Sequence, residues 1–278
     1  MDYQRNRTDQ YVAFFQLEPL PRSQVENVSD VRDYFNFSFT FHHDSPVAIP
    51  FGWAVELDSS QYKTMQEVYP SEVFDDKRRT VAYLPEYCVE NSVSEKYIDE
   101  LSQYVMVERR GPCYDIRNGS RVTDPRWSVE NLIERDFLFY LAFENEVCED
   151  FATEKLWRLG LARHVLPIVL KRSIVEKYVP PHSVIAADDF ATPRKLGEYL
   201  TYLMRNKTAY MEYFEWKQRY EIVSFVNSCP SVLHKPFGLC QLCRLAWKTP
   251  RPQYTMQDMK WYTESCEDKN NFYERLIN

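Results

Sequence analysis

The most constraining feature of the sequence is an alternation of apolar runs and helix-compatible segments between residues 137 and 205. The runs at 137–143, 165–170 and 183–187 predict strands, and the segments at 153–163 and 193–205 predict helices. Thr192 suits the N-cap of the last helix and Pro193 its first position, where a missing amide costs no helical hydrogen bond. Strands that alternate with helices predict a mostly parallel sheet covered on both faces.

A weaker form of the same pattern occurs in the first half. Strands are expected at 11–17, 80–84 and 105–108, and a helix capped by Ser94 is expected at 94–104. The last two strands and the helix between them form one predicted strand-helix-strand unit.

The remaining segments predict the outer parts of the fold. Alternating phenylalanines at 35–41 predict a half-buried extended segment, and 58–77 predicts a polar surface excursion. The polar stretch 109–126, which contains Gly and Pro, predicts an interdomain linker. A further helix is expected at about 208–224.

The composition indicates a folded, acidic protein. Of the 278 residues, 44% are hydrophobic, and the net charge of −7 argues against a general nucleic-acid ligand. No apolar run reaches the roughly 18 residues of a membrane span, and residues 1–10 lack the apolar core of a signal peptide. Taken literally, these features predict a soluble cytosolic chain.

Two other features favour the secretory pathway. Five Asn-x-Ser/Thr sequons are candidate glycosylation sites, at Asn6, Asn27, Asn36, Asn118 and Asn206. Of the seven cysteines, Cys240 and Cys243 form a lone CxxC without a second ligand pair nearby, which favours a disulfide over zinc. The alternative is a cytosolic protein with seven buried thiols, and composition does not decide between the two.

The segment after residue 143 is the first candidate site, because ligands of open α/β sheets bind beyond the carboxyl ends of the strands. Thr153 is expected to cap the next helix, which places Glu154 and Lys155 in its first turn. A cation there opposes the helix dipole, and a bound phosphate would relieve that cost while Glu154 held ribose hydroxyls. The alternative is an ordinary helix start with Lys155 in solvent.

Other polar groups near strand ends are weaker candidates. Glu18 precedes Pro19 at the end of the first strand, where a glutamate is usually a solvated turn residue. His42 and His43 could act as acid, base or metal ligand, but adjacent side chains of an extended segment point to opposite faces, so surface imidazoles are expected. No Gly-rich phosphate loop, nucleophile elbow or HExxH motif is present.

A run of motifs between residues 139 and 217 is much more specific. The motifs are FYLAFEN (139–145), EDFATEKLW (149–157), VLPIVL (165–170), YVPPHSVI (178–185), DDFATPRKLGEYL (188–200) and YFEWK (213–217). They resemble those of the GDP-fucose-dependent α1,3-fucosyltransferases of glycosyltransferase family 10. Weaker matches at 11–21, 33–52, 96–105 and 240–243 extend the resemblance over most of the chain.

The resemblance implies an α/β fold of the GT-B class, in which two Rossmann-like domains face a cleft. It implies an acceptor-side domain at 1–115, truncated at its front, and a GDP-fucose-binding domain with C-terminal helices at 116–278. The implied reaction is inverting transfer of L-fucose from GDP-fucose to a GlcNAc hydroxyl in α1,3 linkage. Such a reaction needs a base for the hydroxyl proton and positive charge for the departing diphosphate.

The resemblance also assigns roles to individual residues. Glu18 falls at the position of the family's proposed catalytic base. The donor-binding positions are Tyr140, Glu144, Asn145, Thr153, Glu154 and Lys155. Glu154 is assigned to the ribose and Lys155 to the diphosphate. No protein-bound metal is implied, although a divalent cation such as Mn²⁺ is expected to stimulate.

One departure from the family concerns the diphosphate. Ser94 stands where the family has an arginine that grips the diphosphate, a contact worth about 1.5 to 3 kcal/mol. Lys96, Arg109 and Arg110 are the candidate substitutes. This departure and the shortened front motivate a second hypothesis, a catalytically impaired relative that binds GDP or glycan without turnover. An unrelated cytosolic α/β protein is the third.

The family implies a cellular setting as well. Its members are type II membrane proteins that act in the Golgi lumen on glycoprotein or glycolipid glycans, and their N-terminal anchor is expected to be missing from this chain. Disulfides Cys88–Cys113 and Cys240–Cys243 are expected there. The acceptor, either core N-glycan GlcNAc or an antennal LacNAc-type unit, and the oligomeric state stay open.

Overall fold

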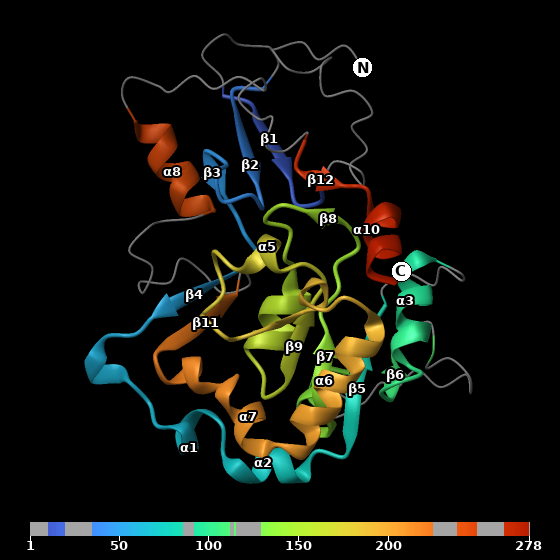
Figure 1. Ribbon diagram of the computed structural model, residues 1–278. Helices are drawn as coiled ribbons and strands as arrows, with labels where there is room; N and C mark the ends of the chain where they lie inside the picture. Colours follow the sequence, from blue (N-terminus) through green and yellow to red (C-terminus); the bar gives the residue numbers. More distant parts are fainter. Residues whose placement is uncertain are drawn as a thin grey trace.

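A five-stranded parallel sheet forms the centre of the computed structural model (Figure 1). The structure describes residues 11–19, 35–85, 92–111, 114, 129–224, 238–248 and 264–277. The strand order is β10-β9-β7-β5-β6, and every pairing is parallel, as predicted. The strands are β5 (Arg79–Tyr83), β6 (Val107–Arg109), β7 (Phe137–Leu141), β9 (Leu166–Val169) and β10 (Ile185–Ala186).

β7 is the central strand, and all five of its residues are buried. Its continuous apolar run, FLFYL, is typical of a parallel strand covered on both faces. The chain connections leave the sheet in opposite directions from β5 and β7, which are neighbours. Such a reversal opens a crevice beyond the carboxyl ends of the two strands, where ligands bind in doubly wound folds.

Two helical layers cover the sheet. One face packs against α3 (Val93–Leu101), α6 (Pro193–Arg205) and α10 (Lys269–Ile277). The other face packs against α4 (Val129–Asp136) and the helix η6 (Lys155–Leu161), which has π-helical hydrogen bonding. The predicted cover on both faces is therefore confirmed.

α6 is the helix that the sequence predicted best. Its bounds agree with the expectation, Pro193 stands in the first turn, and the Thr192 hydroxyl oxygen accepts a hydrogen bond from the Lys195 amide at 3.3 Å. Leu196, Leu200 and Leu203 lie on its buried side. Among the helices of the described ranges, none combines the length and apolarity needed to cross a membrane.

A second, three-stranded parallel sheet contains β1 (Ala13–Gln16), β2 (Phe37–Thr40) and β3 (Val47–Ala48). The expectation that β2 is half-buried is wrong, because all four of its residues are buried. Its polar side chains are satisfied inside, as the hydroxyls of Ser38 and Ser45 lie 2.8 Å apart. β2 is the middle strand and is covered on both faces. The alternation of phenylalanines with polar residues therefore did not mean that the polar side chains are exposed.

The helix α8 (Leu239–Trp247) lies beside β3 in Figure 1. Leu245 is buried in the same apolar cluster as Val47. The Gln241 side chain bonds both ways to this edge, since its Oε1 accepts from the Ala48 amide and its Nε2 donates to the Pro46 carbonyl, each at 2.9 Å. The edge strand is therefore covered by a helix.

The central sheet does not divide as the sequence predicted. β5 and β6 come from the segment assigned to the first unit, yet they pair with each other and β5 pairs with β7. A boundary between residues 115 and 116 would cut through this sheet. By sheet membership, the division instead falls before β5. The strands β1, β2 and β3 form the smaller parallel sheet, and the strands of the larger parallel sheet begin with β5.

The expected helix at 208–224 is wrong in its second half. α7 (Lys207–Glu212) is followed by a 3-10 turn, η8 (Glu215–Gln218), and then by β11 (Tyr220–Ser224). β11 pairs antiparallel with β4 (Gly52–Glu56), which lies far away in sequence. Pairing with a distant strand supplied the backbone hydrogen bonds that a continued helix would otherwise have provided.

Two smaller expectations are also corrected. The N-cap of α3 is Ser92 rather than Ser94, since the Ser92 hydroxyl oxygen accepts from the Glu95 amide at 3.2 Å. The polar excursion contains η3 (Ser59–Gln61), α1 (Met65–Val68) and α2 (Ser71–Asp76). It is anchored to the core by Tyr69, which is 1% exposed.

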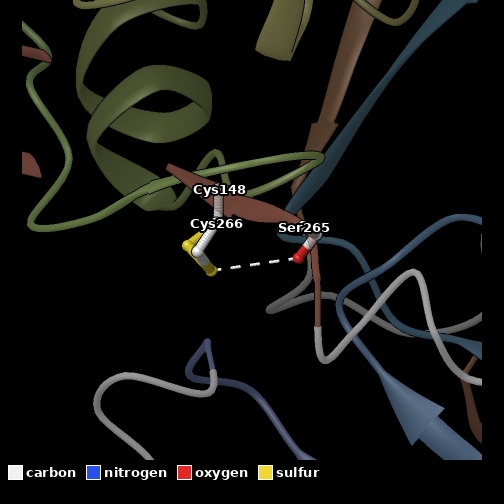
Figure 2. Close-up of a disulfide and its surroundings, with 3 residues drawn as sticks. All are labelled: Cys148, Ser265 and Cys266. Carbon is white, nitrogen blue, oxygen red and sulfur yellow. Dashed lines mark hydrogen bonds between the residues drawn. A yellow bond between two sulfur atoms is a disulfide. The ribbon is translucent and has the colours of Figure 1, made fainter. Parts of the chain in front are cut away.

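A disulfide that the sequence analysis did not predict joins Cys148 and Cys266 (Figure 2). It ties together β8 (Val147–Cys148) and β12 (Cys266–Glu267), which pair antiparallel. The predicted Cys240–Cys243 pair is wrong, because Cys243 is an exposed free thiol while Cys240 is disulfide-bonded to another cysteine. Cys88 and Cys113 lie outside the described residues.

Removing the Cys148–Cys266 disulfide should destabilise the fold. The bond closes a loop of 118 residues, so the Cys148→Ser/Cys266→Ser double variant should lose about 2–4 kcal/mol of unfolding free energy. Urea denaturation without reductant measures this loss. A Cys243→Ser variant is the matched control and should unfold as the wild type does. Peptide mapping that found Cys148 as a free thiol would contradict the assignment.

Candidate active site

A small recess of about 20 Å³ lies beyond the carboxyl ends of β7 and β9. Its polar lining comes from Glu144, Glu146 and Lys171, and the rest of the lining is apolar. The sequence predicted a ligand site at this end of the sheet, and the structure places Glu144 and the start of η6 there.

The Glu144 carboxylate binds the opening turn that leads into η6. Its Oε1 accepts from the Thr153 amide at 2.6 Å, and its Oε2 accepts from the Thr153 hydroxyl at 3.0 Å. The Thr153 Oγ1 in turn accepts from the Lys155 amide at 3.3 Å. The protein's own carboxylate therefore binds the amide just before the N-cap of this helix, at the end where the helix dipole favours an anion.

Lys155 belongs to the same hydrogen-bonded cluster as Glu144 and Thr153. Its side chain is 6% exposed, and its ammonium donates to the Phe143 carbonyl at 3.3 Å and to Asn145 Oδ1 at 3.4 Å. Glu144 Oε2 lies 4.0 Å away. In this conformation the Lys155 ammonium extends neither into solvent nor toward an open anion site, and its contact with a diphosphate stays a prediction. Internal acceptors compensate the cation.

Glu154 is the donor-site candidate with the freest carboxylate. It lies at the N-cap of η6, is half-buried, and follows Thr153 directly. Within the ranges that the structure describes, no hydrogen bond or ion pair engages its side chain. A carboxylate in this state can accept hydroxyl donors from a ligand without first breaking an internal contact.

Tyr140 lies apart from the other predicted donor residues. Its side chain is fully buried within β7, in the apolar cluster that includes Leu156 and Trp157. The structure therefore places Tyr140 under η6 in the core rather than on the recess lining.

Two of the three basic residues proposed to replace the missing arginine, Arg109 and Arg110, are already bound to carboxylates. Arg109 donates to Glu95 at 3.1 Å and also to Asp99. Burial alone would lower the pKa of Arg109, but the hydrogen bond and charge of Glu95 raise it. Arg110 donates to Glu108 at 2.8 Å.

The two other positions near the start of α3 are Lys96 and Ser94. Lys96 is exposed in the first turn of the helix. Ser94 lies close by, with its hydroxyl 2.9 Å from that of Ser92. Lys96 is thus the exposed cation of the three predicted substitutes, while Arg109 and Arg110 would have to exchange carboxylate partners.

Glu18 is exposed two residues beyond the end of β1. Its amide donates to the Gln16 side chain at 3.4 Å. β1 lies next to β8 and β12 in Figure 1, and Phe14 of β1 is buried in one cluster with Cys148 and Phe151. The strand that carries Glu18 is therefore packed against the loop that leads to the donor-site residues.

The histidine pair contradicts its sequence interpretation. His42 and His43 lie in the turn after β2, where the chain is no longer extended, and both rings approach one carboxylate, that of Asp150. Their side chains are 3% and 10% exposed, so they are not surface imidazoles. In the described part of the chain, no group of three His, Cys, Asp or Glu residues is arranged to hold a metal ion.

Asp150 is the residue that sequence reasoning missed. It has a positive φ of 60°, a conformation that aspartate and asparagine tolerate better than most residues. Burial alone would raise the pKa of Asp150, but hydrogen bonds from His43 and the charge of His42 lower it to about 2. The only signal in the sequence was its position directly before the Phe-Ala-Thr-Glu-Lys segment, because its partners His43 and His42 lie 107 and 108 residues away.

Two of the predicted glycosylation sites lie in the described ranges. Asn36 Oδ1 accepts from the Val12 amide at 2.8 Å, across the two strands. Asn206 caps α7, with its Oδ1 accepting from the Ala209 amide at 3.1 Å and its Nδ2 donating to the Tyr202 hydroxyl. Asn6, Asn27 and Asn118 lie outside the described residues. Glycosylation stays a prediction at all five.

Comparison with known proteins decides the family. Residues 74–262 match the family described as "Glycosyltransferase family 10 (fucosyltransferase) C-term". This chain belongs to glycosyltransferase family 10. The predicted family is therefore confirmed, and the match includes the whole segment from β7 to η6.

Curated relatives support the same assignment. The family 10 chain is 37% identical over 271 residues to alpha-(1,3)-fucosyltransferase fut-1 of Caenorhabditis elegans, covering 97% of this chain and 61% of that protein. It is 29% identical over 252 residues to human 3-galactosyl-N-acetylglucosaminide 4-alpha-L-fucosyltransferase FUT3, covering 90% of this chain and 63% of that protein. The chain thus spans less than two thirds of the length of these relatives.

A solved structure supports the fold. The crystal structure of an α1,3-fucosyltransferase with GDP-fucose matches this family 10 chain with a TM-score of 0.50 at 17% identity, covering 87% of this chain and 75% of that one. At this identity the similarity concerns the fold alone, and it confirms the predicted GT-B class.

The histidine–aspartate cluster should make stability depend on pH. Burial lowers the pKa of His42 below its usual value of 6.5, against the opposing charge of Asp150. The unfolded chain therefore binds the proton more readily, and the native state loses stability as pH falls below about 6.5, by at most about 1.4 kcal/mol per pH unit. The Asp150 contribution, present above its unfolded pKa of about 3.9, is lost only toward pH 2.

Urea unfolding at pH 7.5 and 5.5 tests this effect. The wild type should lose more unfolding free energy between these values than a His42→Gln variant, which has no group that titrates at that position. Equal losses in the two proteins would show that the pKa of His42 does not differ between the native and unfolded states.

Proposed function

We propose that this chain transfers L-fucose from GDP-fucose to a GlcNAc hydroxyl of glycoprotein or glycolipid glycans, in α1,3 linkage and with inversion. The observation that carries the proposal is the hydrogen-bonded cluster of Glu144, Thr153 and Lys155 at the carboxyl end of β7 in a family 10 chain. Glu154 lies beside this cluster. The relatives named as fucosyltransferases support it, as does the neighbour crystallised with GDP-fucose.

In the proposed reaction, the acceptor hydroxyl oxygen forms a bond to fucose C1 while the bond from C1 to the diphosphate oxygen breaks. The proton goes to the Glu18 carboxylate, and the bonding electron pair leaves with GDP. Attack and departure on opposite faces of C1 invert the configuration. An exposed carboxylate at a strand end suits the base, since an ionised side chain accepts the proton at neutral pH.

The diphosphate needs a cation, and Lys155 is the buried one closest to the helix start. Its two hydrogen bonds to neutral oxygens are long, at 3.3 and 3.4 Å. A diphosphate oxygen would be a stronger, charge-assisted acceptor, so we propose that the ammonium turns from these oxygens to the ligand. Lys96 is the second candidate, and Glu154 accepts the ribose hydroxyls.

Several properties of the whole protein belong to the same proposal. The Cys148–Cys266 disulfide supports residence in an oxidising compartment, in keeping with a Golgi-lumen enzyme anchored to the membrane by its N-terminal region. GDP-fucose is the donor, no metal is held by the protein, and a divalent cation such as Mn²⁺ stimulates by shielding the departing diphosphate. Assignment of the acceptor and donor roles to the smaller and larger sheets is part of the proposal too.

Donor binding and turnover can be separated by two variants. Glu18→Gln should lower turnover with GDP-fucose and an acceptor-glycan array by about 10²–10⁴-fold, because the general base is lost, while GDP affinity measured by calorimetry stays unchanged. Glu154→Ala should weaken GDP binding about tenfold or more through lost hydrogen bonds to a charged group. Glu198→Ala, an exposed carboxylate on α6, is the control.

The outcomes distinguish the competing functions. Binding of GDP by the wild type without any transfer would reject the enzyme assignment in favour of a binding protein. No binding of GDP at all would reject the site. Turnover that survived Glu18→Gln intact would leave the reaction in place and require a different base.

A further inference from the structure

The Asp150 cluster lies outside the residues that the proposed reaction uses, yet it joins the two parts of the molecule that carry them. Asp150 belongs to the loop between β8 and η6, next to the larger sheet. His42 and His43 follow β2 of the smaller sheet. The contact is thus a link between the two sheets, made by groups 107 residues apart in sequence.

A single carboxylate oxygen is the centre of this link. Asp150 Oδ2 accepts from the His43 backbone amide at 3.0 Å, and the Nδ1 atoms of His42 and His43 each lie 3.2 Å from it. The Asp150 side chain is 1% exposed. A buried carboxylate needs such partners, because an uncompensated charge away from water is strongly unfavourable.

Aromatic packing fixes the position of His43. Its ring stacks on Tyr178 with centroids 3.5 Å apart, and Trp53 meets it edge-on at 4.9 Å. The Tyr178 hydroxyl also helps to lower the pKa of the Asp150 carboxyl. His42 is held from its own turn, where the Asp44 amide lies 3.3 Å from its Nδ1.

Apolar contacts accompany the polar link. Phe151, next to Asp150, is 1% exposed and packs edge-on against Phe41 with centroids 5.2 Å apart. The two consecutive residues of the loop therefore contact consecutive residues that follow β2. This pairing fixes the loop in both position and direction.

The two ends of the link lead directly to the proposed reaction groups. On one side, β2 pairs along its whole length with β1, whose last residue, Gln16, lies two residues before Glu18. On the other side, Asp150 precedes Thr153 and Glu154 by three and four residues. Phe14 of β1 shares an apolar cluster with Phe151, so the polar link and the apolar contacts join the same two segments.

We propose that Asp150, gripped by His42 and His43, is a positioning residue that holds the donor-binding turn in register with Glu18. The inference rests on the proposed function, since it assumes that Glu18 and Glu154 act on one substrate pair. Transfer requires the activated hydroxyl oxygen to be held about 3–3.5 Å from fucose C1, and a 1 Å misplacement can cost roughly 10²-fold in rate. The link controls that distance.

Asp150→Asn is the sharpest test, because asparagine also accepts a positive φ and has the same shape. It removes the charge and leaves the backbone in place. We expect kcat with GDP-fucose to fall about tenfold or more, while the donor KM and the calorimetric GDP affinity change less than about threefold. Amide hydrogen exchange of His43 should accelerate in the same variant, which reports loosening of the link independently of activity.

A second variant and a matched control complete the test. His43→Phe keeps the ring against Tyr178 and the backbone amide but removes Nδ1, and it should lower kcat in the same direction with KM unchanged. Glu149→Gln removes a neighbouring charge that forms an exposed ion pair with Lys177 at 3.3 Å, and it should leave kcat unaltered.

The results distinguish this inference from the proposed function. Unaltered kcat in Asp150→Asn and His43→Phe, with a fully active wild type, would overturn the positioning role alone. A fall in kcat matched by an equal loss of GDP affinity would also overturn it, since the effect would then lie in donor binding. A wild type without turnover would overturn the proposed function, and the positioning role with it.

Discussion

Complete burial of β7 is the constraint on which the rest of the structure depends. The strand is flanked by β5 and β9 and covered by a helical layer on each face, so none of its five residues can present a polar group to water. Polar side chains can appear only past its end, and they do so at once with Glu144 and Asn145. Polar groups gather there because the buried interior excludes unpaired polar groups along the strand itself.

In the turn that follows this segment, contacts within the protein compensate the buried charge of Lys155. A lysine at a helix start is unfavourable by itself, and its burial makes the cost larger. The structure compensates with the Glu144 carboxylate on the Thr153 groups and with two neutral oxygens on the Lys155 ammonium. The site is therefore a closed set of internal contacts, in which a diphosphate would compete with weak partners rather than enter a vacant position.

The smaller sheet is attached to this segment by two kinds of contact. Phe14 shares an apolar cluster with Phe151, and the two histidines approach Asp150. The Cys148–Cys266 disulfide fixes the β8 end of the same loop to β12. In the proposed reaction the smaller sheet presents the acceptor and the larger sheet the donor, so their relative placement would determine whether the reacting atoms meet. The loop between β8 and η6 contacts both sheets.

The sequence by itself determined the elements whose signals are local. The buried run of β7, the cap and first-turn proline of α6, and the motifs that mark family 10 are all carried by residues adjacent in the chain. Only the tertiary structure decided which distant segments meet: β4 with β11 in place of a helix, Cys148 with Cys266 in place of the CxxC pair, and two histidines with one aspartate. Local patterns record what each segment can form, whereas the partner that satisfies a buried strand edge, thiol or charge depends on how the whole chain packs.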